Sequence, residues 1–138
     1  MNLESEHIQQ AIRSAEQNTS GEIMVIVTKK RSANVYEEAQ KAFSKTGLGK
    51  TRAKNAVLIF IAEGSREFAI LGDSGIHAHV GQDFWQELST TLTRSFKENK
   101  FTSGLCEAIS LCGEKLKIHF PRKTDDKNEV SDEVVIHH

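Results

Sequence analysis

Four side chains that carry oxygen ligands stand at the ends of predicted strands and helices: Glu22, Asn55, Asp73 and Asp83. The first two open apolar runs, the third follows such a run, and the fourth opens a helical pattern. Carboxylate and amide oxygens gathered on loops are the ligands that hard cations prefer. These residues are therefore candidate ligands for a hard cation such as calcium or magnesium. A structural interpretation also stays open, in which Glu22 is solvated and the others cap helices or satisfy turns.

Two histidines, His77 and His79, lie between Asp73 and Asp83. In an extended loop, residues two apart point to the same side, so both rings could form half of a zinc or iron site. No third ligand stands at a suitable spacing. A solvated or capping role is therefore favoured for both histidines.

Three basic residues, Lys50, Arg52 and Lys54, precede the second predicted strand. They belong to the same edge of the predicted sheet as the candidate ligands, where cationic groups can contact a phosphate or an acidic partner beside a metal ion. A solvated loop is the alternative interpretation. The other basic cluster, residues 29–31, follows the first strand at the opposite edge, so the two clusters cannot form one patch.

A hairpin and a crossover position the candidate ligands. Strands are predicted over three ranges, the last two joined by a tight turn: 22–28, 55–62 and 66–71. The first two strands are apolar almost throughout, which is typical of strands covered on both faces. A helix capped by Ser32 or Asn34 runs through Ser44 between them and makes a right-handed crossover, so these two strands should be parallel.

This topology predicts which residues meet. The starts of the first two strands and the end of the third lie at one edge of the sheet, because the third strand is antiparallel to the second. Glu22, Asn55 and Asp73 should therefore converge, and the loop over residues 74–82 should bring Asp83 toward them.

Three further helices complete the predicted order helix, strand, helix, strand, strand, helix, helix. The first covers residues 3–17, the second begins at Asp83, and the last is capped by Thr102 or Ser103 and stops before Pro121. This order indicates the α/β class with a small mixed sheet. The helix that begins at Asp83 is expected to place four residues on its inner face: Trp85, Leu88, Leu92 and Phe96.

The length and charge of the chain exclude several classes of protein. Its 138 residues suit one domain, predicted over 1–120, and the charge-rich segment 121–138 should be a flexible tail. Eighteen basic and nineteen acidic residues leave a net charge of −1, which gives no whole-chain attraction for nucleic acid. His137 and His138 could be the remnant of a purification tag and receive no functional weight.

The sequence gives no sign of a membrane or secretory location. The longest apolar run, residues 56–62, is too short to cross a bilayer, and the N-terminus lacks the apolar core of a signal peptide. Cys106 and Cys112 fall on different faces of one predicted helix and should stay unpaired, as in a reducing compartment. We therefore expect a cytoplasmic protein with an unknown protein partner and an undefined oligomeric state.

Two motifs with familiar chemistry fail on physical grounds. Residues 44–51 end in Gly-Lys-Thr like a phosphate-binding loop, but Ser44 stands where the first glycine is required, and the segment follows a helix instead of a strand. No arginine follows Cys106 at the spacing of a thiol phosphatase loop. A nucleoside triphosphatase is therefore rejected, and a thiol phosphatase is unsupported.

Several short motifs in order resemble one family. The motifs are Thr19-Ser20-Gly21-Glu22-Ile23, Gly47-Leu48-Gly49-Lys50, Lys54-Asn55-Ala56-Val57-Leu58 and Gly72-Asp73-Ser74-Gly75-Ile76. They look like segments of the TPM domain, named for thylakoid, photosystem and neuromuscular-junction members. The resemblance runs from about Asn18 to His119, and the acidic tail resembles that of small stand-alone bacterial members.

The resemblance implies a three-layer α/β/α sandwich with an acidic cleft that binds a divalent ion in some members. One plant member is regarded as an acid phosphatase, and others act as accessory or assembly factors. By motif position, the resemblance implies the same four cleft residues as the strand-end argument. Lys54 departs from the family, which often has Asp there, and most relatives carry a signal peptide and a membrane anchor that this sequence lacks.

These observations predict a non-catalytic module that binds calcium at an acidic edge of the sheet and presents a partner surface. The alternative is a metal-dependent phosphatase acting on phosphomonoesters, in which the cation polarises a phosphoryl oxygen and activates water. Against the enzyme stand the departure at Lys54 and the lack of any His, Cys or Ser with an evident activating partner.

Overall fold

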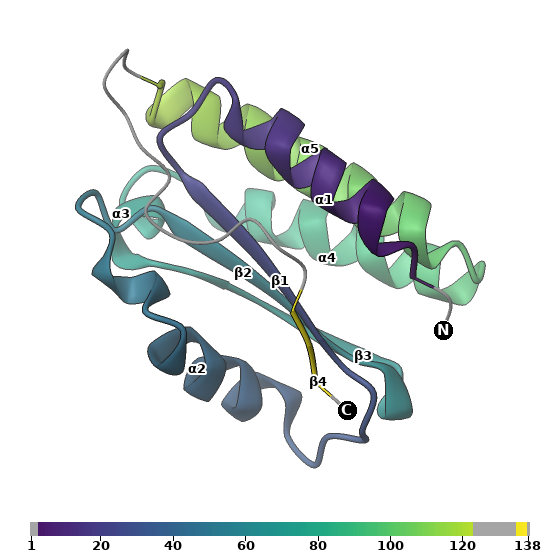
Figure 1. The fold of residues 1–138 in the computed structure, drawn as a ribbon. Coiled ribbons are helices and arrows are strands. Elements are labelled where there is room, and N and C mark those ends of the chain that lie inside the picture. The colour runs from purple at the N-terminus through teal and green to yellow at the C-terminus, as the bar shows by residue number, and fades with distance from the viewer. Residues whose placement is uncertain (1–2, 123–134, 138) are drawn as a thin grey trace.

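The computed structural model describes residues 3–122 and 135–137 and shows a sheet with helices on both faces (Figure 1). The predicted α/β sandwich and its order of helices and strands are confirmed, with α3, β4 and two 3₁₀ turns added. The elements are α1 (Ser5–Glu16), β1 (Glu22–Thr28), α2 (Val35–Lys45), η1 (Leu48–Lys50), β2 (Ala56–Ala62), η2 (Glu63–Ser65), β3 (Glu67–Gly72), α3 (Ser74–His77), α4 (Gln82–Lys97), α5 (Phe101–His119) and β4 (Val135–His137).

The sheet is mixed and has the strand order β3-β2-β1-β4. Strands β1 and β2 are parallel, with Glu22 opposite Ala56, because α2 carries the chain back across the sheet between them. Strands β2 and β3 are antiparallel, with Val57 opposite Gly72, because only the η2 turn joins them. The starts of β1 and β2 and the end of β3 therefore lie at one end of the sheet.

Strand β4 is an addition to the predicted elements. It pairs with β1 in parallel, with Ile26 opposite Val135 and Thr28 opposite His137. Within the segment predicted as a flexible tail, Pro121 forms a bridge with Thr19, whereas residues 123–134 and 138 lie outside the described part of the chain.

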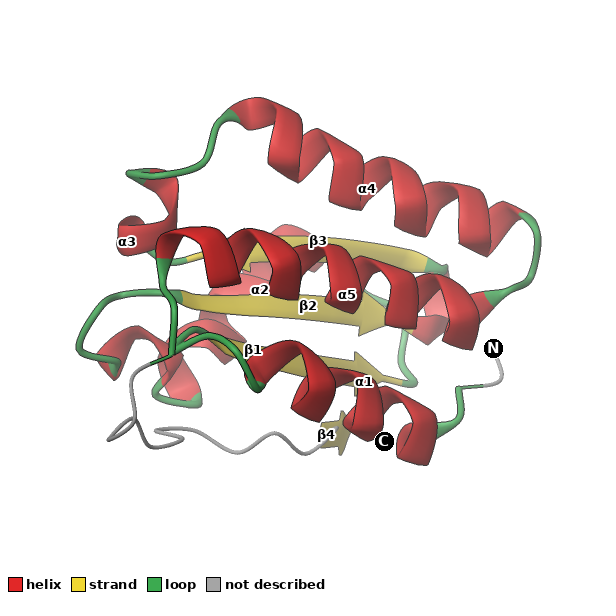
Figure 2. Ribbon diagram, turned by 90° about the horizontal axis from the view of Figure 1, so that it is seen from above, coloured by secondary structure: helices red, strands yellow, loops and turns green. Residues whose placement is uncertain are grey.

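Both faces of the sheet are buried, which accounts for the continuous apolar runs in β1 and β2. Helices α1, α4 and α5 cover one face and α2 covers the other (Figure 2). On β1, Ile23 and Val25 face the three-helix side, whereas Met24 and Ile26 face α2. Within the described ranges, no helix combines the length and apolar character that a bilayer crossing requires.

Two predicted helix starts need correction. Helix α4 begins at Gln82, so Asp83 is not its cap; it lies exposed in the first turn, where a negative charge still interacts favourably with the helix dipole. Helix α5 begins at Phe101 without a side-chain cap. The buried Phe101 ring packs edge-on against Phe96, and this contact fixes the start where a polar cap is missing.

The prediction of which residues form the inner face of α4 is only partly correct. Leu88 and Leu92 are fully buried, and Phe84 is buried with them. Trp85 and Phe96 are only half-buried at the border of this core. The buried stripe is thus shifted by one residue at its first turn.

Candidate functional site

Helix α3 lies at one end of the sheet (Figure 2). At this end Glu22, Ala56 and Asp73 are neighbours across the three strands, and we call these residues the acidic row. Glu22 pairs with Ala56 across β1 and β2, and the Asp73 backbone N–H donates to the Ala56 carbonyl oxygen at 3.0 Å. Because neighbouring strands lie about 4.8 Å apart, the two acidic residues are about 10 Å apart at the backbone, with the small Ala56 between them.

Both acidic residues belong to the α2 face of the sheet. Side chains alternate along a strand, so Glu22 shares its face with Met24, and Asp73 shares its face with Leu71; Met24 and Leu71 both pack with α2. Glu and Asp side chains on one face can reach toward each other over the methyl group of Ala56. The geometry thus places two carboxylates on either side of one gap.

The two carboxylate oxygens of Asp73 have different surroundings. Its Oδ1 atom accepts a hydrogen bond from the Ser74 backbone N–H at 2.8 Å and so caps α3, as the structural interpretation proposed. Its Oδ2 atom is buried and has no hydrogen-bond partner within the described residues. A buried acceptor without a donor is costly, so capping alone does not account for this side chain.

Glu22 and Asn55 are each only 1% exposed. The Glu22 backbone N–H donates to the Asn55 carbonyl oxygen at 3.4 Å, and the Asn55 side-chain nitrogen donates to Ser20 Oγ at 3.3 Å. Asn55 also receives support from Thr51, whose Oγ1 atom accepts from the Asn55 backbone N–H at 3.4 Å. Asn55 thus joins the loops before β1 and β2, and it holds Glu22 at the acidic row.

Asp83 does not join this group. Its side chain is exposed, and no hydrogen bond or ion pair links it to Glu22, Asn55 or Asp73 in the described ranges. In the same part of the chain, no three His, Cys, Asp or Glu side chains lie close enough to hold a metal ion. An ion at the acidic row would therefore take two carboxylates and complete its coordination with amide, carbonyl or water oxygens, as calcium does.

The two predicted histidine candidates lie in different surroundings. His77 packs against Trp85 with ring centroids 5.0 Å apart. His79 packs instead against His119, with centroids 5.4 Å apart, and against Phe120. The rings therefore have separate partners and do not form one pair.

The basic loop lies beside the acidic row. Lys50, Arg52 and Lys54 are all exposed, and the Lys54 ammonium group donates to the Gly49 carbonyl oxygen. The Gly75 backbone N–H donates to the Lys54 carbonyl oxygen at 2.8 Å, so this loop packs directly against the start of α3, next to Asp73. The basic loop is therefore a neighbour of the acidic row through its backbone contact with α3.

Sequence reasoning did not identify the indole N–H of Trp85 as a polar group at this end of the sheet. Trp85 covers Gly72, where a Cβ atom would come within 2.2 Å of the indole ring. The buried Trp85 Nε1–H has no acceptor among the described residues. The one signal available was the glycine before Asp73, which leaves room for a large ring.

The thiols take no part in this site. Burial raises the pKa of the Cys112 thiol to about 12, and the nearby Glu16 carboxylate adds to this effect. Burial also raises the pKa of Cys106, assisted by Glu4. Both cysteines are free, as predicted, and both stay protonated near neutral pH.

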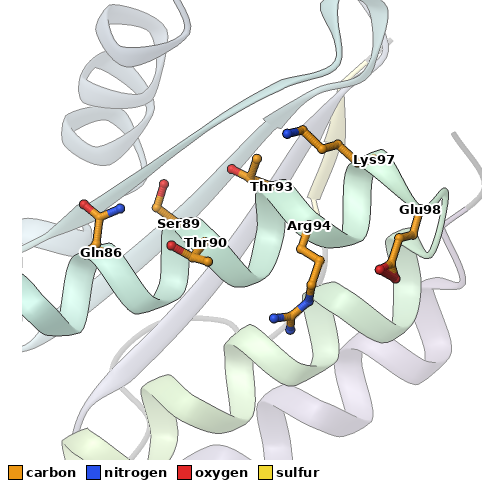
Figure 3. Close-up of a pocket in the computed structure, with 7 residues that line it drawn as sticks. All are labelled: Gln86, Ser89, Thr90, Thr93, Arg94, Lys97 and Glu98. Atoms are coloured by element: carbon orange, nitrogen blue, oxygen red, sulfur yellow. The ribbon is translucent and has the colours of Figure 1, made fainter.

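A separate open hollow of about 450 Å³ lies along the outer face of α4 (Figure 3). It is lined by polar residue types, largely through their apolar atoms, and Arg94 there is already paired with Glu107 of α5 at 3.5 Å. The hollow contains no cluster of ligand-forming groups. The acidic row is therefore the better candidate site.

Comparisons with known proteins are consistent with the fold. Residues 2–115 match the family model of the TPM domain. The chain is similar to the BA42 protein from the psychrophilic bacterium Bizionia argentinensis, with a TM-score of 0.89 and 35% identity over 99% of this chain and 96% of that one. The N-terminal domain of the cg2496 protein from Corynebacterium glutamicum shares the fold, with a TM-score of 0.62 and 13% identity over 96% and 78% of the two chains. No curated protein matches the chain.

Proposed function

This chain belongs to the TPM domain family, and on that premise we propose that it binds a divalent cation, preferably calcium, at the acidic row. Glu22 and Asp73 supply the carboxylates, and Asn55 holds the loops that position them. The acidic row with its bound cation, together with the basic loop beside it, forms the surface that a protein partner contacts.

The observation that carries this proposal is the buried Oδ2 atom of Asp73, which has no donor within the described residues. A cation near this oxygen would replace the missing donor. It would also offset the repulsion between two carboxylates that approach each other in a partly desolvated gap.

The donor types favour calcium over the alternatives. Calcium accepts irregular sets of carboxylate, amide, carbonyl and water oxygens, whereas magnesium requires near-ideal octahedral geometry. Zinc prefers nitrogen and sulfur ligands, and neither histidines nor cysteines belong to the acidic row. Asp83 would need to move to contribute, so we propose Glu22 and Asp73 as the primary ligands.

Calcium titration followed by backbone amide chemical shifts tests the proposal. We expect the first shifts at Asp73 and at Glu22, which are far apart in sequence but lie on the two sides of Ala56 in the row. The Asp73→Asn variant keeps an oxygen that can cap α3 but loses the charge, and it should no longer respond. Glu107→Gln, an exposed acidic residue on α5, is the matched control and should behave as the native protein does.

Two results would contradict calcium binding at this site. One is a titration without shifts at Asp73 and Glu22 at millimolar calcium. The other is an unchanged response in the Asp73→Asn variant. The Asp83→Asn variant tests whether Asp83 is a third ligand. If it is, the variant should weaken calcium binding; if Glu22 and Asp73 are the only carboxylate ligands, it should not.

The basic loop supports a second candidate function, the metal-dependent hydrolysis of phosphomonoesters. A cation at the acidic row would supply polarisation of a phosphoryl oxygen and activation of a water molecule. Lys50 and Arg52 are exposed on the loop that packs beside Asp73, where they could bind the remaining phosphate oxygens. Hydrolysis of a generic phosphomonoester that requires the metal and is lost in Asp73→Asn would support this function; activity that survives the substitution would exclude it.

A further inference from the structure

The end of α5 and the loop between α3 and α4 bring two histidines together. His79 lies in the loop and His119 in the last turn of α5, forty residues later in the chain. Their ring centroids are 5.4 Å apart at an interplanar angle of 25°, and the Phe120 ring packs edge-on against His79 at 5.2 Å. The pair is accessible, since His79 is exposed and His119 is half-buried.

We propose that His79 and His119 form a binding site for a borderline transition-metal ion, zinc, copper(II) or nickel(II), separate from the calcium site. Imidazole nitrogen is a preferred ligand of these ions and a poor ligand for calcium. This site is independent of the proposed function, because it shares no ligand with the acidic row.

The separation of the rings fits a shared ion. Two imidazole nitrogens at about 2.1 Å from one tetrahedral ion place their ring centroids about 5 Å apart, close to the 5.4 Å observed. The nearly parallel rings are packed as they stand, so binding requires one ring to turn. His79 can do so, because it is exposed and the χ2 torsion of histidine has a broad energy profile.

The backbone on both sides of the pair is already held in place. The His79 N–H donates to the Ile76 carbonyl oxygen at 2.9 Å, which fixes the loop at the end of α3. The Phe120 carbonyl oxygen accepts from the Ser20 N–H at 2.9 Å, which fixes the end of α5. Binding therefore needs little ordering of the main chain, and this lowers its entropic cost.

The position of His119 also favours a cation. It lies in the last turn of α5, where unpaired carbonyl groups give the helix end a partial negative charge. No third His, Cys, Asp or Glu side chain gathers with the pair in the described residues. The ion would hence keep water in its remaining positions and could accept a further ligand there, as open zinc sites do.

Zinc titration of the full chain in calcium-saturated buffer, followed by the side-chain and amide signals of the histidines, tests this site. We expect shifts at His79 and His119 and at their neighbours, Val80 and Phe120. His119→Ala should weaken zinc binding about tenfold or more, because one of two ligands is lost. His79→Gln, a change at an exposed position that leaves the fold intact, should do the same.

Three variants provide matched controls. His77→Ala removes the neighbouring histidine that packs on Trp85, and His7→Ala removes an exposed histidine on α1. The third replaces both His137 and His138 with alanine. All three should bind zinc as the native protein does, and so should Asp73→Asn, even though it loses the calcium response.

The proposal is overturned by any of three results. Zinc binding could be unaffected by both His79→Gln and His119→Ala. It could be lost in the variant without His137 and His138. Finally, millimolar zinc could produce no shifts at His79 or His119 in the native protein.

Discussion

The two ends of the sheet differ in the burial of the charged residues at the strand ends. At the end where β1 finishes and η2 turns into β3, the basic residues Lys30, Arg31 and Arg66 are exposed to solvent. At the other end, Glu22 is almost fully buried and Asp73 has a buried oxygen without a partner in the described chain. Burying a charged group is costly, whereas a solvated one costs little. This difference is the reason why we propose a cation at the acidic end and none at the basic end.

The largest loss of stability is expected from the substitution of two glycines, one at each end of the sheet. An alanine Cβ at Gly75 would lie 2.1 Å from the Ala53 carbonyl oxygen, and one at Gly64 would lie 2.5 Å from the Arg31 nitrogen. Each contact involves the backbone, which cannot move aside easily, so Gly75→Ala and Gly64→Ala should each destabilise the fold by about 3 kcal/mol. Urea unfolding measures this loss.

Calcium titration of the same two variants then shows which end of the sheet affects calcium affinity. Gly75→Ala displaces the start of α3 next to Asp73 and should weaken calcium binding, whereas Gly64→Ala should leave the binding of the folded fraction unchanged. Equal loss of calcium affinity in both variants would show that the two ends do not differ in function.

The next effect concerns stability with and without calcium. For the native protein, calcium at about one hundred times its dissociation constant should add about 2.7 kcal/mol to the free energy of unfolding. Asp73→Asn should show almost none of this gain. Without calcium it should be at least as stable as the native protein, since it removes a charge from a half-buried side chain whose Oδ2 atom is buried without a donor in the described chain. Thermal unfolding in calcium and in chelator measures both values. A variant that is destabilised in chelator would mean that Asp73 already has a partner in the free protein.

The sequence was sufficient to predict which strand ends meet at the acidic end of the sheet, but not the position of every side chain there. The apolar runs, the α2 crossover and the tight turn are sufficient to place Glu22, Asn55 and Asp73 at one edge, because strand direction follows from connection length. The exact position of Asp83 does not follow from such rules. It depends on where α4 begins, with Gly81 as the N-cap residue and Trp85 in the first turn packed over Gly72.

Contacts between segments far apart in the chain also could not be predicted from the sequence. The pairing of His79 with His119 depends on how the end of α5 meets the loop before α4, and no local pattern encodes that distance. Strand β4 is likewise set by its pairing with β1 across the chain, in a segment whose composition indicates a tail. Local propensity predicts elements, whereas such pairings need the assembled core.

The third effect arises in the core behind the acidic end. Burial and the neighbouring Glu16 raise the pKa of Cys112 from 9.0 to about 12, so the thiol of the folded protein stays protonated where the unfolded chain already ionises. The free energy of unfolding is therefore unaffected by this thiol below about pH 9. As the pH rises from about 9 toward 12, ionisation of the thiol in the unfolded chain lowers the free energy of unfolding by up to about 1.4 kcal/mol per pH unit. Urea unfolding at pH 8 and at pH 10 measures it. Cys112→Ala is the control, and it should lose this part of the pH dependence; an identical slope in both proteins would contradict the burial effect.

The smallest effect compares two basic residues in the same unusual backbone conformation, one at each end. Lys54 has φ = 53° and Arg66 has φ = 51°, a left-handed region that asparagine adopts more easily than either residue. Lys54→Asn loses a hydrogen bond to the Gly49 carbonyl, and Arg66→Asn loses a contact over the Phe101 ring, so each gain in backbone energy is partly cancelled. Both variants should therefore change stability by no more than about 0.5 kcal/mol. Only Lys54→Asn removes a positive charge beside the acidic row, and it should raise calcium affinity by about twofold, an effect that added salt reduces. If Arg66→Asn raised the affinity equally, the attraction would be a property of the whole chain, and the two ends of the sheet would be electrostatically equivalent toward the ion.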